Sequence, residues 1–499
     1  MTETKQMPIE DLIEGTKQAP KDLGSVLVLG LGKSGKAVAT YCADLLGTRV
    51  RSLSIAAGKY SESAEPFAQQ MRKAGARVEF DHEQIEGTYD LCVVSPGISE
   101  FSDFYQSAKA ASREIVSEVE FAWRESAADS TWVAVTGTNG KTTTTSLVAH
   151  LLKGAGMNAA AVGNIGDCCI DAVASGAVQT YVAEVSSYQL ASTVDFAPQV
   201  ALILNVTPDH LAWHRSFEAY KDAKLKVLSN LASVPGSYAV LDATDDEVRA
   251  VVRQLKSQDP AERGFGYVPV GTAAGLGESM IDRCGSANAA FLDNGVLRVD
   301  VDGRVHELCD FGRMAIKGTH NASNALCAAA AALCLGVGED QVVSGLLSFQ
   351  PLEHRIEPCG SVNGVACFND SKATNVDATL KALSAFEPGK LVLLLGGCDK
   401  GTDLTPLVQE ASKVVRAVVC FGDAGPRFAD AFEEGQDLVP VIRAGKLAQA
   451  LDAALEVAVP GDAVALSPAC ASFDEFNSFE HRGDEFKSYV AERAAARGC

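Results

Sequence analysis

The sequence predicts an α/β protein made of three doubly wound domains. Three blocks of the chain each open with a short apolar run followed by a helical pattern, which is typical of parallel sheets covered by helices. The length of 499 residues also fits about three domains, at roughly 100–200 residues each. Hydrophobic residues make up 47% of the chain, so each block can bury a core of ordinary size.

The first two blocks supply most of the predicted strands. The first block begins with a strand at residues 25–30 and a helix at 34–46, followed by strands at 49–55, 77–80 and 91–95. The second block begins with a strand at 132–136 and a helix at 141–154, followed by strands at 158–162, 181–184 and 200–205. Residues 257–310 are rich in glycine and short alternating runs, so we expect small β-hairpins there.

The third block and the domain boundaries follow from the same patterns. Strands are expected at residues 365–369, 391–395, 417–420 and 462–466, and the Ala-rich run at 322–337 predicts a buried helix. Residues 1–22 are polar and contain no apolar run, which predicts a flexible extension rather than a signal peptide or a membrane span. The predicted domains cover residues 23–127, 128–350 and 351–499, with Pro351 at the second boundary.

The charge and cysteine content limit the class of ligand and the compartment. The chain has 64 acidic and 43 basic residues, and a net charge of −21 disfavours nucleic acid and anionic membranes as partners. An anionic ligand would have to be held locally, by helix N-termini and single Lys or Arg residues. The 14 cysteines include no C-x-x-C pair, which predicts reduced thiols in a cytoplasmic protein.

A first glycine-rich loop, Gly30–Gly35, follows the first predicted strand and is typical of a Rossmann-like domain. Its glycines would let the backbone approach a diphosphate at a helix N-terminus. A dinucleotide site also needs an acid at the end of the second strand, and residues 49–55 contain none. NAD is therefore disfavoured. The diphosphate of another nucleotide and simple tight packing of strand against helix both remain open.

A second loop, Thr136–Thr142, predicts a P-loop NTPase-like central domain. It lies between a strand and a helix, so its N–H groups could cradle phosphates, with Lys141 on the β- and γ-phosphates and Thr142 on Mg²⁺. It departs from the usual pattern because Val135 stands where a glycine is expected. Glu184 and His210 follow neighbouring predicted strands, at the edge where ligands bind in open α/β sheets. The alternative to a phosphate-binding loop is a glycine-rich turn with an exposed lysine.

These segments, with others along the chain, resemble the Mur ligase family. The matching segments are Thr136–Thr142, Gly163–Gly166, Glu184–Leu190, Asn205–Leu211, Gly318–Asn324, His354-Arg355 and Asn369–Asn375. Together they cover nearly the whole chain beyond the first ~20 residues. Leu394–Gly401 and Leu466–Gly483 are similar to the members that add D-glutamate, and the Asp-Asn-Pro-Arg motif of the diaminopimelate- and lysine-adding members is absent.

The resemblance implies a role for each matching position. The nucleotide would be bound by Gly137, Thr138, Asn139, Gly140, Lys141, Thr142, Thr143, Asn321, Asn324, Arg355 and Asp370. Two Mg²⁺ ions would be held by Thr142, Glu184, His210 and Lys224, the last as a carbamate. Lys141, Glu184, His210, Lys224 and Lys372 would be the catalytic residues. Ser34 and Ser95 would contact the UDP group, Asn164 the substrate near ATP, and Thr374, Lys400, Ser472 and Phe479 the amino acid.

The implied reaction joins D-glutamate to UDP-N-acetylmuramoyl-L-alanine with ATP, through an acyl phosphate, in peptidoglycan precursor synthesis. The resemblance assigns residues 23–127 to the UDP-substrate, 128–350 to ATP and 351–499 to the amino acid, in a monomeric cytoplasmic enzyme. Two departures from the family pattern stand out: Ala212 replaces an acid after His210, and the strand at 49–55 lacks the Asp-x-Arg found near uracil in some members.

Three other functions remain open at this stage. One is a ligase of the same fold that joins another amino acid or acts on folate. Another is a nucleotide-dependent oxidoreductase that uses the loop Gly30–Gly35. The third is a P-loop NTPase that acts as a switch and makes no bond.

Overall fold

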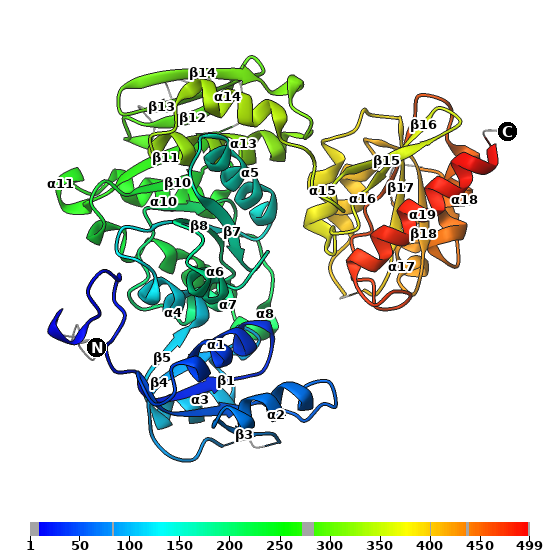
Figure 1. The fold of residues 1–499 in the computed structure, drawn as a ribbon. Coiled ribbons are helices and arrows are strands. Elements are labelled where there is room, and N and C mark those ends of the chain that lie inside the picture. Colours follow the sequence, from blue (N-terminus) through cyan, green and yellow to red (C-terminus); the bar gives the residue numbers. More distant parts are fainter. Residues whose placement is uncertain (1–8, 82–83, 272–283, 400, 436–438, 498–499) are drawn as a thin grey trace. The chain divides into compact units, whose positions relative to one another are not determined.

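The computed structural model describes residues 9–81, 84–271, 284–399, 401–435 and 439–497. They contain three sheets of five, nine and six strands (Figure 1). The chain divides into two compact units: Met1–Phe311 with Ser323–Leu347, and Gly312–Ala322 with Ser348–Cys499. The first unit contains two of the sheets and the second unit the third. The predicted α/β class is confirmed, because the strands of all three sheets are mostly parallel.

The first sheet is parallel throughout, in the order β3-β2-β1-β4-β5. Its strands are β1 (Gly24–Leu29), β2 (Val50–Ala56), β3 (Arg77–Glu79), β4 (Tyr89–Val94) and β5 (Ser112–Ser117). Its helices are α1 (Lys33–Asp44), α2 (Glu65–Lys73), α3 (Asp103–Ala111) and α4 (Glu118–Glu125). The four strands predicted from the sequence are present with ends shifted by one or two residues, and β5 was not predicted.

The second sheet has the order β14-β13-β12-β11-β10-β9-β6-β8-β7. Its parallel part consists of β6 (Thr131–Thr136), β7 (Ala159–Gly163), β8 (Thr180–Glu184), β9 (Val200–Ile203), β10 (Tyr238–Asp242) and β11 (Gly266–Gly271). The helices that bear on the site are α5 (Lys141–Gly154), α6 (Cys169–Ser175), α7 (Ser187–Ala191), α8 (Leu211–His214), α9 (Phe217–Leu225), α13 (Thr319–Cys334) and α14 (Glu339–Ser348).

The small hairpins predicted within residues 257–310 are present at residues 289–310, where they extend this sheet. Strands β12 (Ala289–Asp293), β13 (Val296–Val301) and β14 (Arg304–Asp310) pair antiparallel with one another, as hairpins do. However, β12 also pairs in parallel with β11. Their buried faces carry alternating apolar residues such as Leu297 and Val299, so they continue the core of the sheet.

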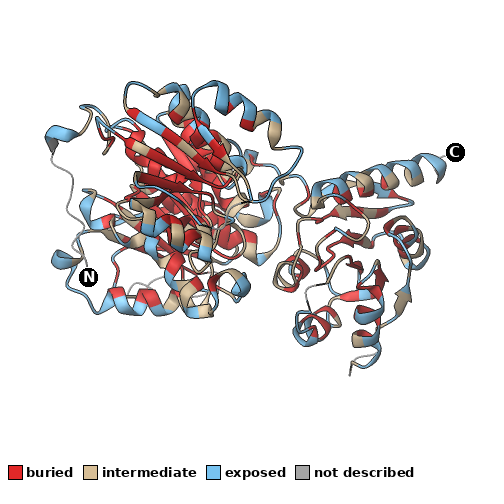
Figure 2. Ribbon diagram, turned by 90° about the horizontal axis from the view of Figure 1, so that it is seen from below, coloured by how far each residue is buried: buried red, intermediate tan, exposed pale blue. Residues whose placement is uncertain are grey.

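The third sheet has the order β15-β16-β20-β17-β18-β19, with only β15 antiparallel. Its strands are β15 (Glu357–Val362), β16 (Val365–Asn369), β17 (Leu391–Gly396), β18 (Val415–Phe421), β19 (Val441–Arg443) and β20 (Ala463–Leu466). Its helices are α15 (Val376–Leu383), α16 (Thr405–Ala411), α17 (Gly425–Glu433), α18 (Leu447–Val457) and α19 (Phe479–Arg497). Every residue of β17 is buried, as expected for a central parallel strand (Figure 2).

Residues 9–22, part of the segment predicted to be flexible, are held against the body of the first unit. The N–H of Lys17 donates to the Ser126 carbonyl at 2.9 Å, and Ala19 is fully buried. The guanidinium of Arg49 donates to the Pro20 carbonyl at 2.6 Å. Main-chain pairing and one buried methyl group therefore order a polar sequence that has no apolar periodicity of its own.

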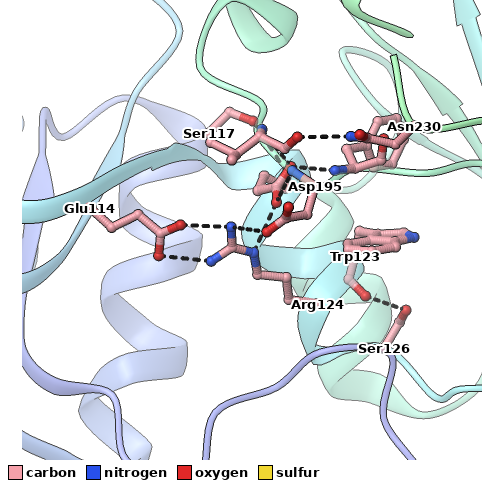
Figure 3. Close-up of polar contacts among 10 residues, drawn as sticks. Glu114, Ser117, Trp123, Arg124, Ser126, Asp195 and Asn230 are labelled. Carbon is pink, nitrogen blue, oxygen red and sulfur yellow. Dashed lines mark hydrogen bonds and ion pairs between the residues drawn. The ribbon is translucent and has the colours of Figure 1, made fainter. Parts of the chain in front are cut away.

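A buried ionic network joins the first two sheets (Figure 3). Arg124 in α4 forms a bidentate pair with Glu114 at 2.9 and 2.8 Å and contacts Asp195 at 3.1 Å. Glu120, which is fully buried, accepts N–H groups of Val194, Asp195 and Phe196 and the Nε–H of Arg124. The Arg124–Glu120 pair is costly to break, because both side chains are buried and the remaining charge would lose its partner.

No described helix combines the length and the hydropathy needed to cross a bilayer.

Candidate active site

The second glycine-rich loop connects β6 to α5 and requires glycine at its end. Gly140 has φ = +83°, in the left-handed region. A Cβ there would also lie 2.6 Å from Oδ1 of Asn324 in α13. Only glycine avoids both problems. The structure therefore brings Asn324 directly against the loop, as expected for two parts of one nucleotide site.

The loop is braced by residues that the sequence analysis did not assign to the site. Asn205, just beyond β9, accepts the Asn139 N–H through its side chain at 2.8 Å and donates back to the Asn139 carbonyl at 3.0 Å. The Thr138 hydroxyl bonds the Thr207 backbone and the Tyr220 hydroxyl, at 2.9 and 2.8 Å. The Thr138 side chain thus holds the loop in shape. Asn205 and Thr207 lie in the segment Asn205–Leu211, of which the sequence analysis assigned only His210 to the site.

Lys141 opens α5, which spans the predicted residues Lys141–Gly154. Its ammonium donates to the carbonyls of Gly137 and Thr138, at 2.9 and 2.8 Å. The charge is therefore held over the loop itself, beside the first N–H groups of α5, where an anion is favoured.

Glu184 and Lys224 lie behind this loop, and both side chains are buried. Glu184 ends β8, and its Oε1 accepts the side-chain amide of Asn164 at 2.7 Å, whereas its Oε2 is buried without a hydrogen-bond partner. Lys224 in α9 donates to the Gly137 carbonyl at 2.8 Å. Burial, and then the charge of Lys141, lowers the pKa of Lys224 well below its usual value. A neutral amine is the form that could accept CO₂ as a carbamate.

The donor atoms fit a hard cation at this edge of the sheet. An unpartnered carboxylate oxygen of Glu184 in a buried site calls for a cation or a proton. Mg²⁺ is usually bound by one or two carboxylates together with substrate phosphates, and the Thr142 hydroxyl follows Lys141 in the chain. Among the residues that the structure describes, no three His, Cys, Asp or Glu side chains form a complete cage. Phosphate oxygens would therefore have to complete the coordination.

His210 differs from Glu184 because it lies in an exposed turn. Its backbone has φ = +54°, and 44% of its side chain is exposed. The Nε2 atom lies 3.5 Å from the Asp209 carboxylate, and the ring lies 4.9 Å from that of Tyr188. His214, four residues on, is fully buried and was not among the predicted site residues.

The first glycine-rich loop, Gly30–Gly35, is tightly packed, and it contacts the segment Gly163–Gly166. A Cβ at Gly35 would lie 2.0 Å from the Gly30 carbonyl, and the Ser95 hydroxyl also lies there, donating to that carbonyl at 3.3 Å. Ser34 is half-buried in the same loop. The Lys33 ammonium bonds the Gly166 carbonyl. Asn164 lies in the same segment, Gly163–Gly166, and bonds Glu184, so Lys33 connects the first loop to the segment that contacts Glu184.

In the second unit, the predicted amino-acid positions gather at the carboxyl ends of parallel strands. Lys372 and Thr374 follow β16, Ser472 follows β20, and Phe479 begins α19. The Lys372 ammonium lies 3.7 Å from the centre of the Phe479 ring, a cation–π contact. Ser472 is buried. Lys400 lies outside the described residues.

Arg482 holds these loops together, although the sequence analysis did not assign it to the site. Its fully buried guanidinium donates to the Ser371 hydroxyl at 2.9 Å and to the Ser371 carbonyl at 2.8 Å. It also donates to the carbonyls of Cys470 and Ala471, at 3.0 and 3.1 Å. One side chain of α19 thus fixes the loops after β16 and β20. It lies inside the segment Leu466–Gly483, which could have pointed to it.

The remaining nucleotide candidates of the second unit are Asn321, Arg355 and Asp370. Asp370 is buried, and its carboxylate accepts the Ser467 hydroxyl at 2.7 Å and the Ile356 N–H at 3.2 Å. Burial raises the pKa of Asp370 to about 7, opposed by Ser467 and Arg355. The Asn321 amide donates to the Lys317 carbonyl at 2.8 Å.

The raised pKa of Asp370 predicts a pH-dependent stability. Between its ordinary pKa of 3.8 and the raised value of about 7, the folded carboxyl is protonated and the unfolded one is ionised. Folding then takes up a proton, so the contribution of Asp370 to stability falls as pH rises through this window. Protection of the 366–374 peptide against hydrogen exchange, measured from pH 4 to 7 and corrected for intrinsic rates, should fall as pH rises. It should fall less in Asp370→Asn than in the wild-type chain. Parallel curves for the two proteins would contradict the assignment.

Comparison with known proteins supports the resemblance to the Mur ligase family along the chain. The Mur ligase middle domain matches residues 135–332, and the Mur ligase glutamate ligase domain matches residues 354–470. The chain is 35% identical over 474 residues to UDP-N-acetylmuramoylalanine–D-glutamate ligase of Thermoanaerobacter sp. strain X514, covering 94% of this chain and 98% of that protein. It is 36% identical to the protein of the same name from Geotalea uraniireducens, covering 93% and 96%.

Solved structures show the same fold at lower identity. The UDP-N-acetylmuramate–alanine ligase of Thermotoga maritima matches with a TM-score of 0.53 and 19% identity, over 94% of this chain and 99% of that one. MurF of Acinetobacter baumannii matches with a TM-score of 0.55 and 17% identity, over 88% and 90%. Since the two full-length relatives match at 35–36% identity and the two domain models match residues 135–332 and 354–470, the chain belongs to the Mur ligase family.

Proposed function

We propose that this chain ligates D-glutamate to UDP-N-acetylmuramoyl-L-alanine. Mur ligases catalyse ATP-dependent ligation in peptidoglycan precursor synthesis, and the relatives similar over the whole chain carry the name of the D-glutamate ligase. The proposal that ATP binds here rests on one observation. Lys141, Lys224 and Asn324 pack around one glycine-rich loop at the carboxyl edge of the second sheet.

The chemistry requires an activated carboxyl group. A carboxylate is a poor electrophile, so the γ-phosphoryl group of ATP is first transferred to the alanine carboxylate, giving an acyl phosphate. This transfer depends on positioning and charge neutralisation rather than on covalent help from the protein. Lys141 would neutralise charge on the β- and γ-phosphates, and the N–H groups around Gly140 would orient them. The amine of D-glutamate then attacks the acyl carbon, and phosphate leaves.

The cation sites belong to this proposal. Thr142 and Glu184 would hold one Mg²⁺, and His210 with a carbamylated Lys224 would hold a second. Bound there, the ions would stabilise the negative charge of the transferring group. The buried, unpartnered Oε2 of Glu184 and the lowered pKa of the Lys224 amine both support these ligands.

We propose that loops of the first unit bind the UDP-substrate and that the second unit binds the amino acid. Ser34 and Ser95 would contact the UDP group, and Asn164 the sugar-peptide end near Glu184. Thr374, Lys400, Ser472 and Phe479 would hold D-glutamate, and Lys372 would lie near the reacting groups. Asn321, Arg355 and Asp370 would contact the adenosine. We assign these roles to a monomer in the cytoplasm, where ATP is available.

An amino-acid panel tests the substrate assignment. Phosphate release with ATP and UDP-N-acetylmuramoyl-L-alanine should be fast with D-glutamate and near background with L-glutamate, L-lysine or diaminopimelate. A site that hydrogen-bonds the side-chain carboxylate of D-glutamate rejects L-lysine, which lacks it, by about 10⁴-fold or more. L-Glutamate and diaminopimelate carry two carboxylates but place them in a different geometry around the reacting amine. Preference for diaminopimelate or lysine would instead indicate a different member of the family.

A further inference from the structure

The turn that carries His210 has an unusual backbone. His210 and Arg215, on either side of α8, have φ values of +54° and +66°. A non-glycine residue in this region is strained, and it persists only where the surroundings hold it. The four-residue helix between them is too short to hold itself. External contacts must therefore fix this turn.

On one side, the turn is fixed by the segment that follows β4. The Ser99 hydroxyl donates to the Trp213 carbonyl at 2.7 Å. The Arg215 guanidinium donates to the Phe101 carbonyl at 2.8 Å and lies 4.9 Å from the Phe101 ring. These contacts involve exposed or half-buried groups and leave the inner face of the turn to other partners.

On the inner face, α8 is tied to α7. The Nε2 atom of His214 and the Ser187 hydroxyl are 2.9 Å apart and share a buried hydrogen bond. The Tyr188 ring stacks on Trp213 at 4.6 Å and on His214 at 5.6 Å, and lies 4.9 Å from His210. A hydrogen bond and an aromatic stack thus join the two short helices α7 and α8. The two bonded residues are 27 positions apart in the sequence.

The link also joins the segments that carry two of the four proposed metal ligands, Glu184 and His210. Helix α7 begins three residues after Glu184, and Ser186 caps it in a capping box with Gln189. Helix α8 follows His210 directly. Because Ser187 is attached to the Glu184 strand and His214 to the His210 turn, their bond sets how His210 lies relative to Glu184.

A buried histidine at position 214 is energetically unfavourable if its side chain only fills space. It has no exposed surface, and its Nδ1 is buried without a hydrogen-bond partner. Leaving such a group unpaired is unfavourable, because its hydrogen bonds to water are lost and not replaced. A phenylalanine would fill a similar volume and avoid this cost. The retained imidazole therefore points to the bond with Ser187 as its role.

We propose that His214 is a positioning residue for the cation site, which acts through Ser187 by holding the His210 turn against the Glu184 strand. This inference rests on the proposed function, because that proposal makes Glu184 and His210 cation ligands. It adds a residue outside the ligand set. The hydrogen-bonded partners of metal ligands commonly tune affinity by about 10–100-fold, and His214 acts one step further out, on the backbone that carries the ligand.

The test is Mn²⁺ binding to the full-length protein with a non-hydrolysable ATP analogue, followed by electron paramagnetic resonance. His214→Phe should weaken Mn²⁺ binding by about 10-fold or more, with less than about 2-fold change in the KM for D-glutamate. Ser187→Ala removes only a hydroxyl and should weaken Mn²⁺ binding similarly. The double variant should add little, because both changes break one bond. His214→Gln, which offers a polar atom at similar reach, should restore part of the affinity.

A matched control separates this role from general stability. His306 in β14 is also buried, and its Nδ1 lies 2.9 Å from the Glu339 carboxylate. His306→Phe removes a comparable buried polar contact away from the strand ends and should leave Mn²⁺ binding unchanged. Wild-type Mn²⁺ affinity in folded His214→Phe and in Ser187→Ala would overturn the inference.

His210→Ala distinguishes this failure from failure of the metal assignment itself. If His210→Ala weakens Mn²⁺ binding and both His214→Phe and Ser187→Ala do not, only the positioning role is wrong. If His210→Ala leaves Mn²⁺ binding unchanged, His210 is not a ligand and the positioning role falls with it.

Discussion

Replacing Lys141 by alanine is expected to reduce turnover by on the order of 10³-fold or more. The ammonium is held over the loop at Gly137 and Thr138, where it would meet the transferring phosphoryl group. Phosphoryl transfer depends on such charge neutralisation, and single cationic groups contribute about 10³–10⁵-fold. Steady-state phosphate release with all three substrates measures the effect.

The control for this prediction lies in the same helix. Lys153 is exposed in the last turn of α5, so Lys153→Ala removes a similar charge far from the loop. Its activity should match that of the wild-type chain. If Lys141→Ala and Lys153→Ala had equal turnover, the loop would have no role in the chemistry.

Replacing Arg482 by alanine is expected to have the largest effect on the second unit. The change would leave the buried carbonyls of Ser371 and Cys470 without the donor that Arg482 supplies, and it would open a cavity. Leaving a buried carbonyl without a donor costs about 1–3 kcal/mol for each group. Exchange of the peptides around residues 366–374 and 467–483 should therefore be faster by on the order of 100-fold.

Arg443 provides the comparison for Arg482. It lies on the surface of the same unit and pairs with Asp430 and Glu433, each at 2.7 Å. Arg443→Ala should leave exchange of both peptides unchanged, because exposed ion pairs contribute little. Wild-type exchange rates in Arg482→Ala would show that the loops after β16 and β20 are held by other contacts.

Local sequence patterns predicted those helices and strands whose own residues show a clear apolar or glycine-rich pattern. Helix α5 has the bounds expected from a strand, a glycine-rich loop and a helical pattern in series. The buried strands of the parallel sheets contain runs of apolar residues that need no partner to be recognised. By contrast, β5 at the edge of its sheet begins Ser-Arg-Glu, and this mixed pattern gave no strand signal.

The residues that position the site could not be found in this way. Arg482 acts on Ser371, which is 111 residues away in the chain, and His214 acts on Ser187. Each is unremarkable as a single residue, and its role depends on which loop the fold places beside it. Likewise, the polar segment 9–22 is ordered by backbone bonds to Arg124 and Ser126, which composition does not encode.

The central claim is that ATP cleavage at this loop is coupled to formation of one amide bond. The most direct measurement follows phosphate and the ligated UDP-muramoyl dipeptide together, the latter by mass spectrometry. We predict one product molecule for each phosphate, and no phosphate above background when UDP-N-acetylmuramoyl-L-alanine is omitted. Phosphate release without both substrates, or without product, would contradict a ligase and indicate a nucleotide switch.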